Sequence, residues 1–262
     1  MNLPMLTAAL CPLAFALLWW RQTKTRNATS VDAAWAIAIG VLGLASAADG
    51  TGHALQRTLA AVLVGLWSVR LSWHLVAHRV LGHAHEDGRY RAMREHWGER
   101  ANARLFWFYQ AQAVAAVVFA TPFWFLAQHA SPHLQAIQWS GLAIVGLAQW
   151  LEGLADRQLE RHRQDPTQRG RTCRSGLWRY SRHPNYFFEW LTWCGIACCA
   201  APAAGWFAVL QPVVMFILVR FVSGVPFTEL QSQKSRGDDY RRYQQETSAF
   251  VPWWPRRPKD ER

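Results

Sequence analysis

The segment 171–189 gathers the side chains of this chain that are best suited to hold an anionic ligand. It reads RTCRSGLWRYSRHPNYFFE, and an apolar run at 190–204 follows at once. Its charged and amide side chains are Arg171, Arg174, Arg179, Arg182, His183, Asn185 and Glu189. Guanidinium groups bind phosphate through paired hydrogen bonds, and amide and carboxylate groups can recognise the rest of a nucleotide. We interpret the segment as a clamp for a polyanion. The alternative is a basic flank of a membrane helix, which needs arginines but neither His-Pro-Asn-Tyr nor Glu189.

The elements that must position this segment are apolar helices. Sixteen Trp, 51% hydrophobic residues and a net charge of +11 in 262 residues fit neither a soluble globule nor a disordered chain. Seven runs have roughly the 20 residues that cross about 30 Å of hydrocarbon. They are 3–20, 31–48, 58–77, 105–128, 136–155, 186–204 and 206–225. The sequence therefore predicts an all-α fold, an integral membrane bundle of seven transmembrane helices.

The basic residues are sorted by loop. Of the 28 Lys and Arg residues, 25 lie at 21–26, 79–104, 157–182 and 234–262, which fall on one side of a seven-span bundle. The opposite loops carry only Arg57. The positive-inside rule then places the N-terminus outside and the C-terminus in the cytoplasm. Because the charge follows the loops, we expect a lipid bilayer rather than nucleic acid as the partner of this basic chain. We expect one integral membrane domain over 1–262, with its oligomeric state open.

Ionisable residues inside the spans are costly there, so each is a candidate for function. They are Asp32, Arg70, Glu152, Asp156, Glu189 and Arg220. Asp32 follows Ser30 and Val31 in a good helix start, so an N-cap role competes evenly with a role in a site. Glu152 and Asp156 lie one turn apart, and pairing with nearby arginines is their structural alternative.

Histidines and cysteines give a weaker signal. His74 and His78 are four residues apart, with His83 and His85 nearby, and this spacing can hold a metal. A membrane di-iron hydroxylase needs several such pairs, so we expect interfacial histidines and no metal site. The five cysteines form no CxxC pair and are interpreted as small packing residues.

Three stretches together resemble the steroid 5α-reductase superfamily, in particular its bacterial branch of membrane proteins. They are 156–189 with the core GLWRYSRHPNYFFE, the tail 224–253 with GVPFTE, YRRY and SAFVPW, and, more weakly, SVDAAW at 30–35 with Arg70 and EDGRY at 86–90. The resemblance covers most of the chain. It implies a seven-helix reductase, in a bacterial inner membrane, that binds NADPH from the cytoplasmic side through a C-terminal part at about 136–255.

The resemblance also implies which residues hold the cofactor. The cofactor-binding candidates are Arg70, Glu152, Asp156, Arg163, Arg171, Tyr180, His183, Asn185, Glu189 and Glu229. Glu152 stands where steroid reductases commonly have Asn. Eight arginines between 157 and 182 could neutralise a pyrophosphate and a 2′-phosphate. The chain has no G-x-G-x-x-G, so no Rossmann domain is implied.

The chain departs from steroid reductases on the substrate side. Those enzymes use a Gln-Glu pair on the second helix and a Tyr on the third, whereas here AIAIGV follows Trp35 and Trp67 stands at the Tyr position. Asp32 and Tyr90 are the candidates for a catalytic acid. The expected reaction is hydride transfer from NADPH to a carbon–carbon double bond of a lipophilic substrate, sterol-, polyprenyl- or fatty-acyl-like.

Two other functions stay open. Arg182-His-Pro-Asn-Tyr before a helical hairpin, then an acidic residue and Tyr-x-x-Tyr, also resembles membrane isoprenylcysteine-type methyltransferases, which use S-adenosylmethionine. Their run of adjacent Glu residues is reduced here to Glu229, and a sulfonium cofactor without phosphate has less use for the arginines. A lipid-binding protein without turnover is the non-enzymatic alternative.

Overall fold

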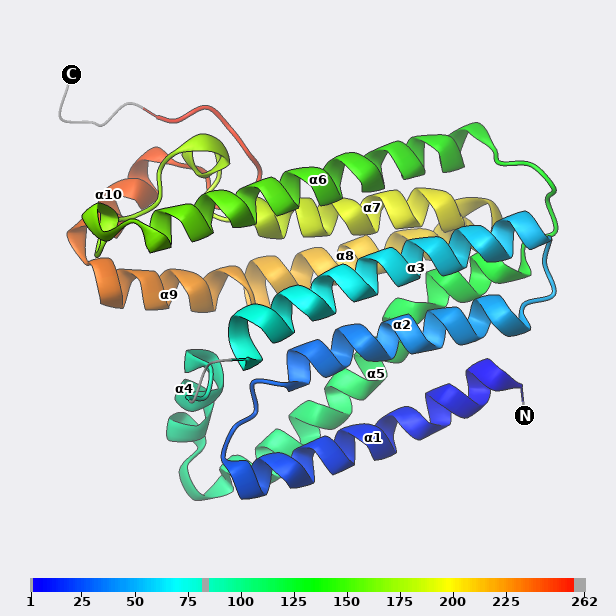
Figure 1. Ribbon diagram of the computed structural model, residues 1–262, viewed down its shortest axis with the longest axis horizontal. Helices are drawn as coiled ribbons and strands as arrows, with labels where there is room; N and C mark the ends of the chain where they lie inside the picture. Colours follow the sequence, from blue (N-terminus) through cyan, green and yellow to red (C-terminus); the bar gives the residue numbers. More distant parts are fainter. Residues whose placement is uncertain (1, 82–84, 257–262) are drawn as a thin grey trace. The chain divides into compact units, whose positions relative to one another are not determined.

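A computed structural model describes residues 2–81 and 85–256 of the chain, and every element in them is a helix apart from one isolated bridge between Ser181 and Ser248. The α-helices are α1 (Leu3–Thr25), α2 (Val31–Asp49), α3 (Ala54–Leu75), α4 (Gly88–Trp97), α5 (Ala101–Gln128), α6 (Ala136–Gln164), α7 (Pro184–Ala204), α8 (Leu210–Ile217), α9 (Val225–Arg236) and α10 (Asp238–Glu246) (Figure 1). The all-α prediction is confirmed. His83 lies outside the described residues.

Five helical segments are long and apolar enough to cross a membrane. They are Leu3–Thr25, Val31–Asp49, Ala54–Val80, Gly88–Gln128 and Pro184–Arg236. The chain is therefore a multi-pass membrane protein by the length and composition of its helices. Each of the seven predicted spans falls on helix, but α6 is outside these five, and the last two predicted spans share one segment. The count of seven and the orientation of the termini stay predictions.

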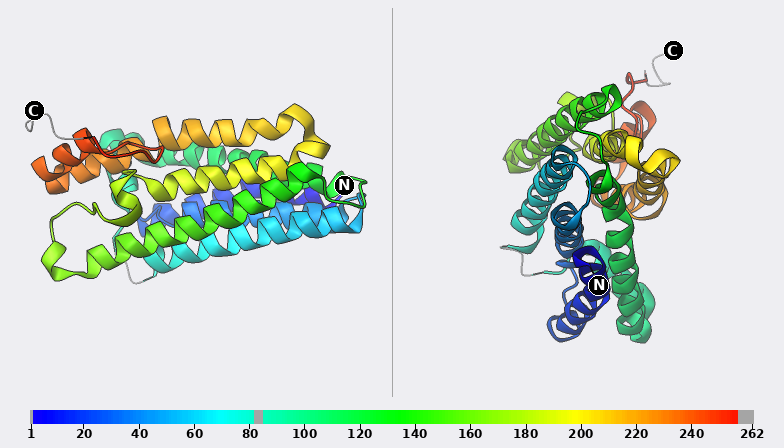
Figure 2. Two further views of the ribbon diagram at one scale, coloured as in Figure 1. Left: turned by 90° about the horizontal axis from the view of Figure 1, so that it is seen from above. Right: turned by 90° about the vertical axis from the view of Figure 1, so that its right-hand side faces the viewer.

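The described residues form two compact units, and each is considered by itself. Unit 1 comprises residues 2–135 with 202–205, and unit 2 comprises 136–201 with 206–256. Unit 2 begins at the residue where the sequence placed the start of the cofactor-binding part. Figure 2 gives two further views of these helices.

Small residues let the helices of unit 1 approach closely. A Cβ added at Gly43 of α2 would lie 2.7 Å from Val64 Cγ2 of α3, so only glycine fits there. Ser68 of α3 donates its hydroxyl to the Ala36 carbonyl oxygen of α2 at 2.9 Å. Close backbone approach and interhelical hydrogen bonds hold helices together in lipid, where burial of apolar side chains gives little drive.

The two ends of unit 1 differ in charge. At one end the Gly52 and His53 amides donate to carbonyls of Ala127 and His129 at 3.0 and 2.9 Å. Arg57 lies near this end and donates to the Ala47 and Ala48 carbonyls at 2.9 and 2.7 Å. It therefore satisfies the last carbonyls of α2, which explains an arginine on the side that otherwise lacks basic loop residues.

Unit 2 uses the same packing device between α6 and α7. A Cβ at Gly141 would lie 2.6 Å from the Gly195 carbonyl oxygen, so the two backbones touch at this pair. Gln138 donates to the Cys199 carbonyl oxygen at 3.1 Å in the same interface. The Trp190 indole N–H of α7 donates to the Pro212 carbonyl oxygen of α8 at 3.0 Å, so α8 is fastened to α7.

Candidate functional site

The connection from α6 to α7 is fixed on α6 by one close approach and two hydrogen bonds. Gly176 has φ +59, and a Cβ there would collide with the side-chain amide of Gln158. The Leu177 amide donates to Gln158 Oε1 at 2.9 Å, and the buried Trp178 indole donates to the Ala155 carbonyl oxygen at 2.9 Å. Glycine is needed at 176 because other residues disfavour this left-handed conformation.

The same connection is fixed on α10 by charge. Asp239 accepts the Thr172 amide at 2.8 Å and the Arg174 guanidinium at 3.0 Å. Arg174 also pairs with Glu246 at 3.1 Å, and the buried hydroxyl of Tyr243 donates to the Trp178 carbonyl oxygen. Burial raises the pKa of Asp239, but the Thr172 hydrogen bonds and the Arg174 charge outweigh it, so that pKa lies below its usual value. Asp239 therefore stays ionised at neutral pH.

Arg182 is the most heavily bonded arginine of the 171–189 segment. Its guanidinium pairs with Glu229 of α9 at 2.6 Å and donates to the Gln244 and Thr247 carbonyls at 2.9 and 2.6 Å. The neighbouring His183 is buried, with Nε2 3.4 Å from Glu229 Oε1. Burial lowers the pKa of His183 below its usual value, although Glu229 opposes this shift. These two residues join α7 to α9 and α10.

The residues that hold the connection in place also line an open polar cavity of about 800 Å³ in unit 2. Its wall includes Arg161 and His162 of α6, together with Arg171, Thr172 and Arg174. The side chains of Arg161 and Arg171 are exposed and form no ion pair or hydrogen bond with any other described residue. The volume lies within the range of small-molecule sites. The cavity thus carries two guanidinium groups that form no ion pair with the described residues, although the Asp165 carboxylate also lines it.

Polar side chains of α6 and α7 meet within unit 2. Asn185 donates its side-chain amide to Asp156 Oδ1 at 3.1 Å. Glu152 is 5% exposed and accepts from Gln149 at 3.3 Å, while Glu189 is 7% exposed and accepts the Trp193 indole N–H at 3.1 Å. The Asn185–Asp156 bond joins the two helices, whereas the bonds of Glu152 and Glu189 stay within α6 and α7 and satisfy buried carboxylates there.

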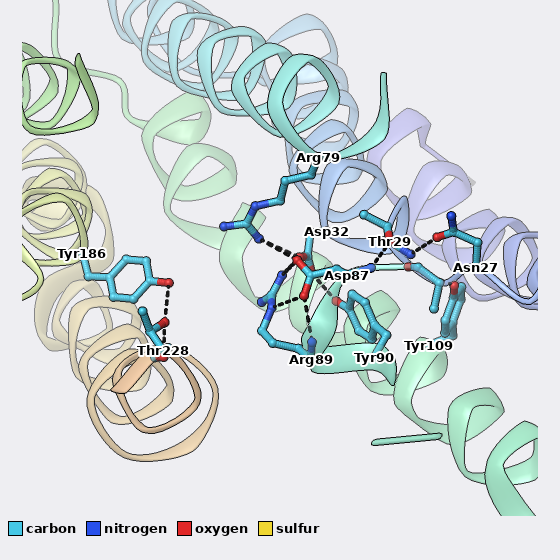
Figure 3. Close-up of polar contacts among 12 residues, drawn as sticks. Asn27, Thr29, Asp32, Arg79, Asp87, Arg89, Tyr90, Tyr109, Tyr186 and Thr228 are labelled. Carbon is cyan, nitrogen blue, oxygen red and sulfur yellow. Dashed lines mark hydrogen bonds and ion pairs between the residues drawn. The ribbon is translucent and has the colours of Figure 1, made fainter. Parts of the chain in front are cut away.

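In unit 1 the carboxylate of Asp32 lies at the centre of a second polar cluster (Figure 3). Tyr90 donates its hydroxyl to Asp32 Oδ1, and Arg89 and Arg79 approach Oδ2 at 2.6 and 3.4 Å. Asp32 is the second residue of α2 and makes no cap; the N-cap is Ser30, without a side-chain cap bond. The prediction of an N-cap role for Asp32 is therefore wrong. Its carboxylate binds side chains of α4 instead of capping α2.

Asp87 extends this cluster and starts α4. Its carboxylate caps the helix by accepting the Arg89 amide at 2.9 Å and also pairs with the Arg89 guanidinium at 3.2 Å. Burial raises the pKa of Asp87, but the bonds and charge of Arg89 and the charge of Arg79 outweigh it, so that pKa lies below its usual value. Two carboxylates and two guanidiniums balance here, and the Tyr90 proton is held by Asp32.

A neighbouring contact joins the same two loops of unit 1. Glu86 accepts the Ala28 amide at 2.9 Å and pairs with Arg94 at 2.8 Å. Arg94 also donates to Gln22 of α1 at 3.0 Å. The basic segments 21–26 and 79–104 therefore lie together at one end of unit 1, as the sorting of charge predicts.

The structure groups some of the predicted site residues and separates others. Within unit 2, it pairs Asp156 with Asn185 and His183 with Glu229. Tyr180 contributes its carbonyl oxygen to the Trp253 amide at 2.9 Å, so it helps to hold the tail. Arg163 is exposed and does not line the cavity, and Arg70 belongs to unit 1. The catalytic candidates Asp32 and Tyr90 are in direct contact. Their roles toward a ligand stay predictions.

Sequence reasoning missed the residues that build the cavity wall around Arg171. They include Gln158, Arg161, Thr172 and Asp239. Of these, only Arg161 could have been suggested by the sequence, as one of the arginines between 157 and 182. The others could not, because the contact of 172–174 with α10 joins segments about 65 residues apart.

The histidine pair spans the junction of α3, which holds His74, and η1 (Val76–Val80), a π-helical turn that continues α3 and holds His78. The rings of His74 and His78 stack with centroids 4.6 Å apart. Among the residues that the structure describes, no group of three or more His, Cys, Asp or Glu side chains is arranged to hold a metal.

Comparison with known proteins bears on the whole chain. No curated protein and no solved structure matches it. A family model with the description "Protein of unknown function (DUF1295)" matches residues 18–247, from α1 to the end of α10. The match includes both units and every candidate site residue named above. The chain therefore belongs to the DUF1295 family.

Proposed function

We propose that the protein is a membrane-embedded, NADPH-dependent reductase that saturates a carbon–carbon double bond of a lipophilic substrate. The DUF1295 family is steroid 5α-reductase-like, which is compatible with this activity. The long apolar helices suit a protein whose substrate dissolves in the bilayer.

The observation that carries the proposal is the arginine-lined cavity of unit 2. NADPH bears a pyrophosphate and a 2′-phosphate, and the cavity offers uncompensated guanidiniums from Arg161 and Arg171. Outside this cavity but in the same unit, Asp156 and Asn185 provide a carboxylate and an amide that could bind ribose hydroxyls or the nicotinamide amide of an extended ligand. The residues present therefore fit the cofactor. When bound, NADPH would supply a hydride, and a proton would complete the addition of two hydrogens.

The work of the chain itself is to hold the cavity wall still. The connection 171–183 is bonded to α6 through Gln158 and to α10 through Asp239, so Arg171 and Thr172 are held at defined places. A preformed wall loses little conformational entropy when a ligand binds. This favours a binding site over a flexible basic flank, whose arginines would need no such supports.

A ligand series tests the proposal. Purified protein in detergent is heated with NADPH, NADH or S-adenosylmethionine, because a ligand that binds only the folded state raises the unfolding temperature. We expect NADPH to stabilise most. Arg171→Ala and Asn185→Ala should reduce that stabilisation, while Arg179→Ala, an exposed arginine of the same segment outside the cavity wall, should not. Stabilisation by S-adenosylmethionine alone would replace the reductase proposal with a methyltransferase.

A further inference from the structure

We propose that residues 248–256, the tail that follows α10, bind the surface of the bilayer and prefer anionic phospholipid there. The ligand is the headgroup region of the membrane, where phosphate lies next to hydrocarbon. The contact belongs to unit 2 and does not depend on which ligand the cavity of that unit holds.

The first argument is the exposure of large apolar side chains in the tail. Val251, Trp253 and Trp254 are 51%, 69% and 74% exposed and lie outside the helices. Neighbouring apolar side chains that stay exposed mark an interaction surface. Tryptophan combines an apolar ring with an N–H donor and is enriched where hydrocarbon meets water. The tail therefore presents the side chains that suit a membrane surface.

The second argument is that the backbone of the tail is fixed. Four hydrogen bonds hold it, donated by the Arg182 amide to the Ser248 carbonyl oxygen at 2.8 Å, by the Ser181 hydroxyl to that of Phe250 at 2.7 Å, by the Trp253 amide to that of Tyr180 at 2.9 Å and by the Arg256 amide to that of Glu246 at 2.8 Å. The exposure of the two tryptophans is thus set by the fold and does not come from a loose chain end. A preformed surface loses little conformational entropy when it binds.

The third argument is the position of the tail beside a membrane span (Figure 1). Phe250 is 3% exposed, and its ring contacts Phe187 and Trp190 of α7 and Phe216 of α8, with centroids 5.7, 6.0 and 5.5 Å apart. α7 opens the candidate span Pro184–Arg236, and its two aromatic residues lie about 5–9 Å along the helix from its start. The tail therefore crosses the end of a span, at the depth of the lipid headgroups, and continues a surface that lipid covers.

The fourth argument is the charge beside the tryptophans. Arg179 and Arg256 are exposed, and neither forms an ion pair with the residues that the structure describes. Glu246, whose carbonyl oxygen holds Arg256, has its carboxylate paired with Arg174 at 3.1 Å. The sequence continues with RPK at 257–259, outside the described residues. Basic residues beside a bilayer are attracted to anionic lipid, which explains a preference for phosphatidylglycerol over phosphatidylcholine.

Lipid bound at the tail should also stabilise the connection from α6 to α7. Three of the four hydrogen bonds of the tail end on residues 180–182, and the buried bridge between Ser181 and Ser248 lies among them. Opening of the tail breaks these bonds, so a ligand that binds only the closed tail makes the opening of both segments rarer. The charge of the bilayer thus acts on the stability of the segment that carries part of the cavity wall.

The test measures amide hydrogen exchange in the purified full chain, in nanodiscs of phosphatidylcholine alone or mixed with phosphatidylglycerol. We expect phosphatidylglycerol to slow exchange in residues 248–256 and 178–183 by about five- to thirtyfold, the gain from one or two cations near an anionic surface. Arg256→Gln should lose about fivefold of this protection. The double variant Trp253→Ser, Trp254→Ser should exchange faster than the parent protein in both bilayers.

Two variants are matched controls, and the Tm of every variant in detergent shows that it is folded. Trp206 is 73% exposed after the other end of α7, and Arg241 is exposed on α10. Trp206→Ser and Arg241→Gln should each retain the full response of the tail to phosphatidylglycerol.

Three outcomes would overturn the proposal. The first is equal exchange of the parent tail in the two kinds of bilayer. The second is a response of Arg256→Gln as large as that of the parent protein. The third is protection that appears in detergent without lipid and grows with protein concentration, because this would assign the tail to a contact between copies of the chain.

Discussion

Replacing Arg182 with Ala tests whether arginines of the 171–189 segment divide into structural and ligand-binding groups. Arg182 is 10% exposed in its side chain and forms an ion pair with Glu229 at 2.6 Å. It also donates to the carbonyl oxygen of Gln244, in the last turn of α10, and to that of Thr247, which follows α10. We expect Arg182→Ala to destabilise the protein and loosen the tail, because Glu229 loses its ion pair and the two carbonyl oxygens lose a charged donor.

The magnitude can be worked from these contacts. Removing one partner of a buried ion pair costs about 3–5 kcal/mol, mostly because a charge is left behind. Glu229 retains two donors, Gln244 Nε2 at 3.0 Å and His183 Nε2 at 3.4 Å, so the lower end applies. At about 2–4 °C per kcal/mol for a chain of this size, a loss of about 3 kcal/mol lowers Tm by about 6–12 °C. Arg182→Lys keeps the charge but not the fork and should lose about half as much.

The assay is thermal unfolding in detergent, together with limited proteolysis of residues 248–256. The Arg182 amide binds the Ser248 carbonyl oxygen at 2.8 Å, so loosening at Arg182 should speed cleavage of this tail. Arg171→Ala is the matched control: it is exposed and should change stability by no more than about 0.5 kcal/mol. An Arg182→Ala protein with the parent Tm and the parent cleavage rate would refute the division into two groups.

Three further predictions concern buried contacts and the charge of His183. Asp32→Asn and Tyr90→Phe should each lower Tm. Because the two groups share one hydrogen bond, the double variant should lose less stability than the sum of the single variants, and a double-mutant cycle should give a coupling energy of about 0.5–3 kcal/mol. Gly141→Ala should destabilise by about 1–3 kcal/mol by pressing on a carbonyl of α7, whereas Gly146→Ala on the same helix has open space and should not; thermal unfolding of the two variants decides. The pKa of His183 is lowered in the folded state, so neutral His183 contributes fully to stability above about pH 6.5. This contribution is lost as the pH falls through the folded-state pKa. When Tm is measured from pH 7.5 to 5, it should therefore fall less in His183→Gln than in the parent protein.

The sequence predicts helices well here because apolar runs of about 20 residues have few alternatives in lipid. All seven predicted spans fall on helix, since backbone polar groups in hydrocarbon must be satisfied internally. The transmembrane status of α6 is harder to predict. Gln138, Gln149 and Glu152 lower its hydropathy, yet each is hydrogen-bonded within unit 2. Polarity along α6 therefore reports helix–helix contacts and does not by itself place the helix outside the membrane.

The roles of individual arginines could not be predicted from the sequence. Arg171 and Arg182 lie in the same basic segment, eleven positions apart, and local composition gives them the same meaning. Their difference arises from which distant acids reach them: Glu229 reaches Arg182, whereas no described acid reaches Arg171. Pairing of this kind depends on how α9 and α10 fold back on the connection. The sequence of residues 171–189 alone does not show which distant acids will pair with these arginines.

The sequence also could not predict that Asp32 and Tyr90 contact each other. The sequence suggests each of them separately as an acid, since each stands near a motif. In unit 1, the Tyr90 hydroxyl donates to an Asp32 carboxylate that also accepts from Arg89 and Arg79. Each group is thus already engaged as the hydrogen-bond partner of the other. Either residue would need a rearrangement of the cluster before it could protonate a substrate.

The division of the arginines into paired and unpaired ones explains how a cationic cavity can form in a stable fold. A segment with eight arginines between 157 and 182 would repel itself unless some were neutralised, because like charges at close range oppose compaction. In unit 2, Arg174 and Arg182 are neutralised by Asp239, Glu246 and Glu229, and those ion pairs are also the bonds that fix the wall to α9 and α10. Among the arginines that line the cavity, Arg174 is paired, whereas Arg161 and Arg171 form no ion pair with the described residues. Internal pairing thus builds the wall, and the charge left over is available to attract an anionic ligand.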